Sequence, residues 1–553
     1  MQQSVPTTSD VQATFVATLV DEWCRLGLRD AVISPGSRST PLALALHRRS
    51  DVRVHVRIDE RSAAFFALGR ALATRRPVAV VVTSGTAAAE VHAAVAEADL
   101  ARVGLMILTA DRPPELHGVG APQTIDQRHL YGSMVRVYEE PGVARREASM
   151  SWRPLAQRLW RHASGAAGLA GPVHLNAAFV EPLLGESLEL PAAVETVGDV
   201  HSALERSAGA AELVVNGQRV LCVVGAGVSA TVVESARRAN WVVVGDATAV
   251  GAVALADPLV RHDEIWRALR PDVIVRLGGL PASKFLAQRL ATCDVPVVGL
   301  EGCGPVADPD GVVHYRLAGR PDPTLDAHRA DAAYAALWQS VSDELADAVA
   351  SWWDDELDEV LVARLVVQAA HRHDAALVVG SSMPVRDVEW WSESRRGPVY
   401  ANRGANGIDG VVSTFLGVAS GARALGLVGD VTMLHDVSAL VEGAGAHTHA
   451  VLVVNDNGGG GIFSFLAQAR ELPADQFGEL FATSRDHDLV AIAHAFGHYA
   501  QRVGSATALR RALDDAVQRP GLSVVVAMVP SRDANVARHD ELNARVGQWW
   551  RQR

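Results

Sequence analysis

Two stretches near the C-terminal end of the chain combine glycine with an acidic or amide side chain. Asp430 follows Gly429 in "LGLVGDVTMLHD", and Asn457 opens "NGGGGIF", 457 − 430 = 27 residues further on. Carboxylate, amide and freed backbone carbonyl oxygens are the hard ligands that Mg²⁺ prefers, usually together with phosphate oxygens. Glycines 458–461 would let the backbone approach a diphosphate closely. The pattern predicts a site for Mg²⁺ and a diphosphate, although either stretch alone reads more simply as a glycine-rich loop or an Asp helix cap.

The spacing of 27 residues is about the length of a strand–helix–strand unit, so we expect each of the two stretches to follow a strand. Short runs rich in Val and Ile end in Gly, Ser, Thr or Asp, as in "DAVISPGS" and "PVAVVVTSGT", and alanine-rich helical stretches separate them. This alternation of short strands and helices predicts an α/β protein with parallel sheets covered by helices on both faces. Polar residues at strand ends would then meet at the carboxyl edge of a sheet, where ligands of open α/β sheets bind.

The α/β pattern occurs three times along the chain. It pauses after residue 185, where Pro and Glu cluster without periodicity, and charged helical sequence fills 330–360 before the third series begins. We therefore predict three domains, residues 1–188, 189–350 and 351–553, each of ordinary domain size.

Composition favours small-molecule chemistry. The 553 residues are 49% hydrophobic, and a net charge of −12 provides no basic field for nucleic acid. The four cysteines form no disulfide framework, the N-terminus lacks a basic leader, and no apolar stretch approaches the roughly 20 residues of a membrane span. We expect a cytoplasmic protein that neither binds nucleic acid nor inserts stably into a membrane.

The middle segment contains a partial dinucleotide-binding motif. Gly225 and Gly227 follow a predicted strand in "RVLCVVGAGVSA", but position 230 is Ala. Because a partial GxGxxG match is weak evidence, an ordinary tight turn is the better interpretation and NAD is not assigned.

The GD(x)₂₆N pattern resembles the signature of thiamine diphosphate (ThDP) enzymes, with Val431 and the pair Asp456-Asn457 as departures from its usual form. Within that superfamily, "SPGSRSTPL", "IDERSAAFFALG", "VTSGTA", "TADRPPEL", "NRGANGIDG" and "GGIFSFL" closely resemble the MenD family of 2-succinyl-5-enolpyruvyl-6-hydroxy-3-cyclohexene-1-carboxylate (SEPHCHC) synthases of menaquinone biosynthesis. The resemblance covers the first and third predicted domains and is thin in the middle one. It implies a pyrimidine-binding, a central and a diphosphate-binding domain.

The resemblance also implies the cofactors, ThDP with Mg²⁺ or Mn²⁺, and the residues that hold them. Glu60 matches the catalytic glutamate that hydrogen-bonds the aminopyrimidine and promotes its imino tautomer. On spacing alone, Glu60 reads more simply as an acidic residue that begins a helix and is stabilised by the helix dipole. The implied cofactor positions are Glu60, Ser84, Gly85, Ile408, Gly429, Asp430, Asn457, Gly459 and Ile462, with Asp430, Asn457 and Gly459 on the metal.

The implied reaction decarboxylates 2-oxoglutarate and adds the resulting succinyl carbanion equivalent to isochorismate in a Stetter-like 1,4 addition. Arginine suits such substrates because its planar fork binds carboxylates bidentately. The implied substrate positions are Ser37, Arg38, Arg112, Gln123, Lys284, Ser382, Arg386, Arg403, Phe463 and Leu466. Any one arginine is more often a surface or ion-pair residue, and the two apolar positions fit an ordinary buried face nearly as well. Phe285 stands beside Lys284 where some relatives carry a second cation.

Two alternatives stay open. Another ThDP-dependent 2-oxoacid decarboxylase or acetolactate-type synthase would share Asp430, Asn457 and Glu60 but not this arginine set. A catalytically silent nucleotide-binding regulatory protein on the same scaffold would not need Glu60. The resemblance further implies a homodimer or homotetramer with active sites between chains.

Overall fold

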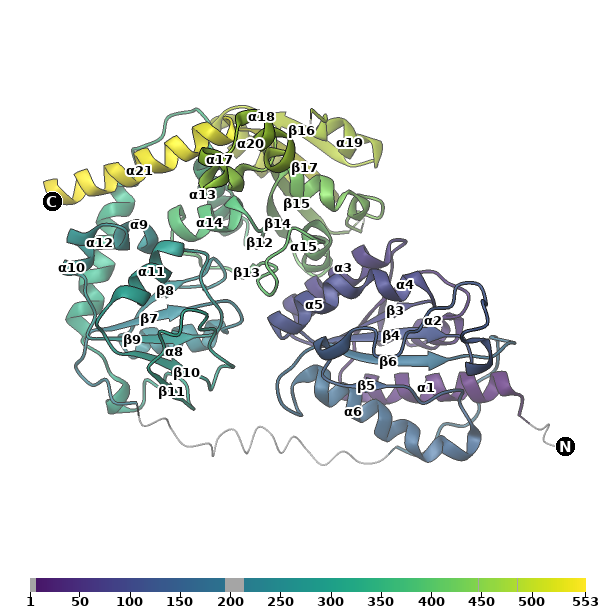
Figure 1. The fold of residues 1–553 in the computed structure, drawn as a ribbon. Coiled ribbons are helices and arrows are strands. Elements are labelled where there is room, and N and C mark those ends of the chain that lie inside the picture. Colours follow the sequence, from purple (N-terminus) through teal and green to yellow (C-terminus); the bar gives the residue numbers. More distant parts are fainter. Residues whose placement is uncertain (1–5, 194–212, 446, 485) are drawn as a thin grey trace. The chain divides into compact units, whose positions relative to one another are not determined.

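The computed structural model describes residues 6–193, 213–445, 447–484 and 486–553 (Figure 1). Its contacts divide these residues into two compact units. The first comprises residues 6–193 with 402–421 and 436–442, and the second comprises the other described residues. No helix in the described ranges has the length and apolar character needed to cross a bilayer.

The first sheet is parallel, with strand order β2-β1-β3-β4-β6-β5. Its strands are β1 (Asp30–Ile33), β2 (Arg53–Val56), β3 (Val78–Val82), β4 (Leu105–Asp111), β5 (Tyr138–Glu139) and β6 (Val173–Ala178). Its helices are α1 (Thr8–Leu26), α2 (Thr40–His47), α3 (Glu60–Thr74), α4 (Thr86–Glu90), α5 (His92–Ala101) and α6 (Trp152–Ser164). Figure 1 shows α1 and α6 on one face of the sheet and α3 and α5 on the other.

The side chains of this sheet alternate between the two faces, as the period of a β-strand requires. Ala31, Ile33, Ala79 and Val81 belong to the core under α1, α2 and α6. The intervening Val32 and Val80 are equally buried but lie outside that core. Burial on both faces explains why these strands read as nearly continuous apolar runs.

A segment from far along the chain completes the first unit. Helix α15 (Val411–Ala419) packs along α3. The contact is close because a Cβ on Gly69 would lie 2.0 Å from the Thr414 carbonyl oxygen, and one on Gly417 would lie 2.1 Å from that of Phe66. These two glycines therefore let the helix backbones approach each other.

The second unit contains two further parallel sheets, with orders β11-β10-β9-β7-β8 and β13-β12-β14-β15-β17-β16. The strands of the former are β7 (Val220–Val224), β8 (Val242–Gly245), β9 (Val273–Leu277), β10 (Val297–Leu300) and β11 (Tyr315–Leu317). Those of the latter are β12 (Ala376–Val379), β13 (Val399–Tyr400), β14 (Ala424–Gly429), β15 (His449–Asp456), β16 (Tyr499–Val503) and β17 (Gly521–Met528). The three parallel sheets confirm the predicted fold class, whereas the exact domain boundaries stay a prediction.

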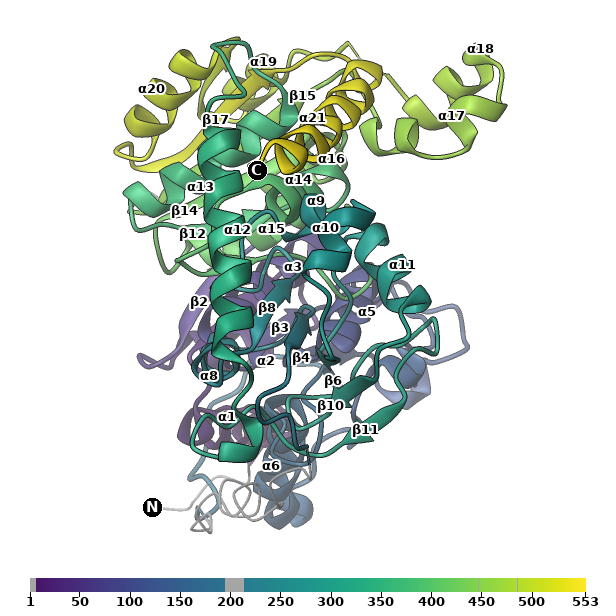
Figure 2. The same ribbon diagram turned by 90° about the vertical axis from the view of Figure 1, so that its left-hand side faces the viewer.

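Helices cover both of these sheets. Around the central sheet are α8 (Ala230–Arg238), α9 (Ala256–Val260), α10 (Asp263–Ala268), α11 (Lys284–Thr292) and α12 (Ala332–Ala350). The C-terminal part adds α13 (Glu359–Arg372), α14 (Met383–Trp391), α16 (Asp430–His435), α17 (Gln468–Glu471), α18 (Ala474–Phe477), α19 (Leu489–Ala495), α20 (Ala506–Ala516) and α21 (Arg532–Gln552). Figure 2 shows α20 beside β17, and the core of the third sheet joins α13 and α20 to β12, β14, β15 and β17.

Candidate active site

Glu60 is the first residue of α3, at the carboxyl end of β2. Asp59 caps the helix, its carboxylate accepting a hydrogen bond from the Ser62 N–H at 3.0 Å. Glu60 is half-buried, and burial raises its pKa, with the negative charges of Asp59 and Glu90 acting in the same direction. The structure thus gives Glu60 a carboxyl group that holds a proton more tightly than a solvated one.

Ser84 and Gly85 follow β3 at the same edge of the sheet. The Ser84 hydroxyl donates to the Gln123 carbonyl oxygen at 2.9 Å, and the Gly85 N–H donates to Gln127 Oε1 at 2.9 Å. Gly85 has φ +87°, and a Cβ there would meet the Gln123 side chain at 2.9 Å, so the position requires glycine. The exposed Gln123 is therefore held beside the Ser84–Gly85 turn.

Arg38 and Arg112 lie in the loops after β1 and β4. Arg38 is 5% exposed, donates to the Phe179 carbonyl oxygen at 3.0 Å and pairs with Glu181 at 3.0 Å. Burial, followed by the nearby positive charge of Arg112, lowers the pKa of Arg38. Ser37 beside it is exposed. Two neighbouring guanidinium groups therefore lie near the carboxyl edge of the first sheet, although Arg38 already has an internal carboxylate partner.

Arg403 and Ile408 occupy the loop before α15, which α5 holds in place. The Glu97 carboxylate of α5 accepts the N–H groups of Gly404 and Ala405, each at 2.6 Å. The guanidinium of Arg403 bonds the side chain of Asn406, and Ile408 is half-buried. The loop that carries two predicted site residues is thus fixed within the first unit, the unit that contains Glu60.

Asp430 and Asn457 follow the adjacent strands β14 and β15, as predicted. The Gly459 N–H donates to Asp430 Oδ2 at 2.8 Å and approaches Asn457 Oδ1 at 3.2 Å, so the two side-chain oxygens converge on one backbone group. Asp430 is 7% exposed, and burial raises its pKa to about 6, against the lowering effect of the Val431 and Gly459 N–H groups. A buried carboxylate beside an amide oxygen is a donor set that fits a divalent cation.

The glycines around these oxygens divide into two kinds. Apart from the adjoining residues of the chain, no atom of the described residues lies within 4 Å of a Cβ built on Gly429 or Gly458, so both border open space. A Cβ on Gly459, at φ +135°, would instead lie 2.3 Å from the Ala482 carbonyl oxygen. Open space next to bare backbone and hard oxygen ligands suits a diphosphate with its metal.

Ser382 and Arg386 lie in the turn after β12 and in the first turns of α14. Ser382 has φ +74° and ψ −135°, a region that only glycine occupies readily. Arg386 Nη1 donates to the Ser382 carbonyl oxygen at 2.6 Å. The strained serine and the arginine therefore hold each other at this edge of the third sheet.

Lys284 begins α11 of the central sheet and is exposed. The residues before it are fixed by α14, because Glu389 accepts the Ala282 and Ser283 N–H groups at 2.7 and 2.8 Å. The loop that carries Lys284 is thereby attached to the helix that carries Arg386.

Ile462, Phe463 and Leu466 lie in or directly after the 3₁₀ turn η6 (Gly461–Phe465), and all three are half-buried. Ile462 packs against the apolar cluster shared by α9, α14 and α21. The Phe463 ring lies 5.8 Å from that of Phe481.

The structure therefore places most of the predicted residues at the edges of the first and third sheets, and Lys284 at the start of α11 beside the central sheet. Ser37, Arg38, Glu60, Ser84, Gly85, Arg112, Gln123, Arg403 and Ile408 belong to the first unit, and Lys284, Ser382, Arg386, Gly429, Asp430, Asn457, Gly459, Ile462, Phe463 and Leu466 to the second. Sequence reasoning missed the side chains that fix these loops, Glu97, Gln127 and Glu389. Glu97 stands out in the sequence only as a polar residue among alanines, and Gln127 and Glu389 stand close to other polar residues and carry no signal of their own.

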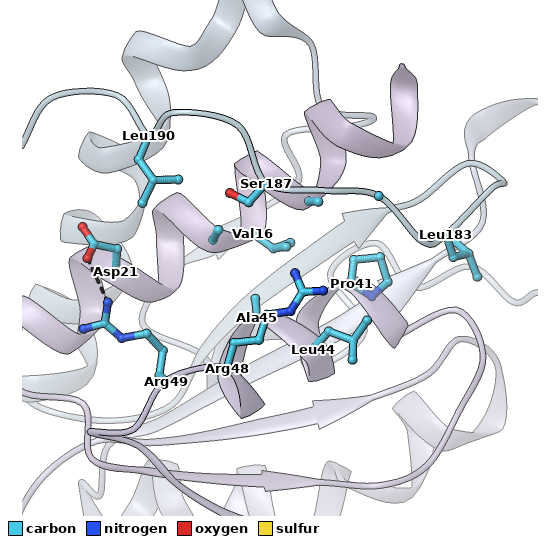
Figure 3. A pocket seen from close by; sticks show the side chains of 13 residues that line it. Val16, Asp21, Pro41, Leu44, Ala45, Arg48, Arg49, Leu183, Ser187 and Leu190 are labelled. Carbon is cyan, nitrogen blue, oxygen red and sulfur yellow. Dashed lines mark hydrogen bonds and ion pairs between the residues drawn. The ribbon is translucent and has the colours of Figure 1, made fainter. Parts of the chain in front are cut away.

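Two pockets of the structure lie away from these residues. One of about 140 Å³, lined by α1, α2 and residues 183–190, is bordered by Val16, Leu44 and Leu190, with Asp21 paired to Arg49 at its side (Figure 3). Another of about 630 Å³ is polar and contains Arg29, Arg53 and Arg70. Neither contains a predicted site residue.

Among the described residues, no three His, Cys, Asp or Glu side chains cluster to hold a metal. Such a cluster is not needed where an amide, a carbonyl and phosphate oxygens complete the shell.

Comparison with known protein families gives two matches. Residues 13–130 match the N-terminal TPP (thiamine pyrophosphate) binding domain of thiamine pyrophosphate enzymes, and residues 396–527 match the C-terminal TPP binding domain. Thiamine pyrophosphate is another name for ThDP. The two matched ranges contain Glu60, Asp430 and Asn457, whereas Lys284, Ser382 and Arg386 lie outside them.

Individual proteins match along nearly the whole chain. A protein from Thermobifida fusca is 39% identical, with 90% of this chain and 92% of that protein covered. Proteins from Geobacillus kaustophilus and Listeria monocytogenes are 35% and 33% identical, with 96% and 97% of this chain and 97% and 98% of those proteins covered. All three are named 2-succinyl-5-enolpyruvyl-6-hydroxy-3-cyclohexene-1-carboxylate synthase.

Proposed function

This chain belongs to the SEPHCHC synthase family of ThDP-dependent enzymes, and on that premise we infer that it transfers a succinyl group from 2-oxoglutarate to isochorismate in menaquinone biosynthesis, with loss of CO₂. The observation that carries the inference is the convergence of Asp430 and Asn457 on the Gly459 N–H, in a chain that named synthases match over at least 90% of its length.

We propose that Asp430, Asn457 and Gly459 hold a divalent metal against the diphosphate, with Gly429 and Gly458 leaving room for it. ThDP, when bound, supplies a nucleophilic thiazolium carbon and an electron sink for decarboxylation. Glu60 acts on the pyrimidine end by sharing a proton with a ring nitrogen. The raised pKa of Glu60 favours this role, because a half-buried carboxyl keeps a proton more readily than a solvated one.

The remaining predicted residues bind and shield the substrates. Arg38 and Arg112 on the first unit, and Arg386 and Lys284 on the second, hold carboxylates, and Arg403 lies in a loop fixed to α5. Arg38 would exchange its exposed partner Glu181 for a substrate carboxylate. Ile462, Phe463 and Leu466 exclude water from the reacting carbon.

We further propose a homodimer or larger homo-oligomer whose sites form between chains. Glu60 and Asp430 fall in different compact units of one chain, so a site that needs both residues can take one unit from each of two copies. When inactive Glu60→Gln and Asp430→Ala chains are mixed under conditions of subunit exchange, one site of each mixed dimer is wholly wild type. Activity should therefore return, whereas a demonstrably mixed but inactive dimer would contradict shared sites.

We propose a cytoplasmic location on the basis of four free thiols, Cys24, Cys222, Cys293 and Cys303, the state expected in a reducing compartment.

Product analysis tests the reaction itself. Mass spectrometry of a mixture of 2-oxoglutarate, isochorismate, ThDP and Mg²⁺ should show the SEPHCHC product. An acetolactate-type enzyme would instead form the same products with and without isochorismate, and a silent regulatory protein would release no CO₂.

A further inference from the structure

The orientation of the Asn457 amide decides whether this residue can serve a metal. An amide carries an oxygen that accepts and a nitrogen that only donates, so a cation can use just one end. Asn457 Nδ2 donates to Glu359 Oε1 at 2.8 Å, and Oδ1 is left facing the Gly459 N–H beside Asp430. Glu359 Oε1 accepts from Nδ2 while the Gly459 N–H donates to Oδ1, so the two contacts together select the orientation in which the amide oxygen points towards Asp430.

Glu359 is itself held rigidly. It is 2% exposed in the first turn of α13, whose cap Asp358 accepts the Leu361 N–H at 2.6 Å and pairs with Arg538 at 2.8 Å. Among the described residues, the Asn457 amide is the one group that donates a hydrogen bond to the Glu359 side chain. Because Glu359 is buried and accepts a hydrogen bond from this one amide, it can fix the orientation of the Asn457 side chain.

The glycine run provides the room for this contact. A Cβ on Gly461 would lie 2.6 Å from Asn457 Nδ2 and 3.7 Å from Glu359 Oε1. Any larger residue at 461 would therefore push the amide away from the carboxylate. The pair joins positions 98 residues apart in the sequence.

We propose that Glu359 is a positioning residue that fixes the Asn457 amide with its oxygen towards the metal. The inference rests on the proposed metal site at Asp430 and Asn457. A partner that orients a metal ligand without touching the metal commonly changes metal affinity 10- to 100-fold when it is removed.

The test measures Mn²⁺ affinity by electron paramagnetic resonance in the presence of ThDP, so that it does not depend on turnover. Glu359→Leu should weaken Mn²⁺ binding about 10- to 100-fold. Glu359→Gln keeps an oxygen that can accept from Nδ2 and should restore affinity to near the wild-type value. Glu356→Leu, the same change at an exposed glutamate three residues earlier, should leave Mn²⁺ affinity unchanged.

A second pair of variants covers the case in which Glu359→Leu does not fold. Asn457→Asp removes the Nδ2 donor, so Glu359 no longer fixes the orientation of residue 457, and Mn²⁺ binding should weaken despite the added charge. Adding Glu359→Gln supplies a donor again and should recover the affinity.

The outcomes separate the two levels of the argument. Wild-type Mn²⁺ affinity in folded Glu359→Leu, or no recovery in the double variant, would overturn the positioning role while Asp430→Ala still lost the metal. If Asp430→Ala also bound Mn²⁺ normally, the proposed metal site would itself be wrong, and the positioning role with it.

Discussion

Glu97→Gln tests whether α5 fixes the loop that carries Arg403 and Ile408. The buried Glu97 carboxylate accepts two backbone N–H groups, from Gly404 and Ala405. Glutamine keeps one accepting oxygen and turns an NH₂ group towards the other N–H. A buried N–H without an acceptor costs about 1 to 3 kcal/mol.

Part of that cost is recovered, because burial raises the pKa of Glu97 and neutral glutamine is easier to bury. We therefore expect a net loss of about 1.4 kcal/mol, equivalent to a tenfold shift in the opening equilibrium of the loop.

Hydrogen exchange measured by mass spectrometry on a peptide covering 402–408 should show about tenfold faster exchange in the variant, with peptides from β4 unchanged. The kcat/KM should fall by a similar factor, because the loop carries two predicted site residues. Glu115→Gln, an exposed Glu→Gln change on the same unit, should alter neither quantity. Wild-type exchange and kinetics in Glu97→Gln would refute the account of this loop.

Three further changes have distinct signatures. Asp430→Ala should abolish ThDP binding in calorimetry while circular dichroism stays native, and unchanged affinity would remove Asp430 from the metal site. Ser382→Gly should raise the free energy of unfolding by about 1 kcal/mol, since glycine relieves the strain at φ +74°. The same change should lower kcat/KM because the hydroxyl is lost. A variant that is less stable than wild type would count against the strain. His174 is fully buried and its Nδ1 has no hydrogen-bond partner among the described residues, so burial lowers its pKa from 6.5 to about 3. The unfolded chain then binds more protons below pH 6.5, and stability should fall by about 2 kcal/mol between pH 7 and 5; denaturant unfolding of His174→Leu should lack this part of the slope, and an identical slope would contradict it.

The local pattern of the sequence predicts the sheets and their polar edges well. The strand ends predicted from the alternation of strands and helices are occupied by Gly429, Asp430 and Asn457. This prediction works because strand length and turn chemistry are local properties of the sequence. The glycine run was informative for the same reason, since bare backbone after a strand has few uses.

Partners that lie far apart in the sequence were not predictable. Arg38 meets Glu181 across 143 residues, and Glu359 meets Asn457 across 98. Such pairs depend on how whole elements pack in space, and the sequence around a carboxylate in a helix does not identify the residue that donates a hydrogen bond to it. The inclusion of residues 402–421 in the first unit is a similar case, because it follows from the packing of α15 on α3 rather than from any break in composition.

The most direct measurement of the central claim is the exchange of the thiazolium C2 proton of bound ThDP, followed by NMR in wild type and Glu60→Gln. Glutamine keeps the shape of Glu60 but cannot share a proton with the pyrimidine ring as a carboxyl group does. The account predicts that the variant still binds ThDP and that exchange slows by more than the roughly 10²- to 10⁴-fold of a typical acid–base group. Exchange at the wild-type rate on cofactor bound to Glu60→Gln would contradict it.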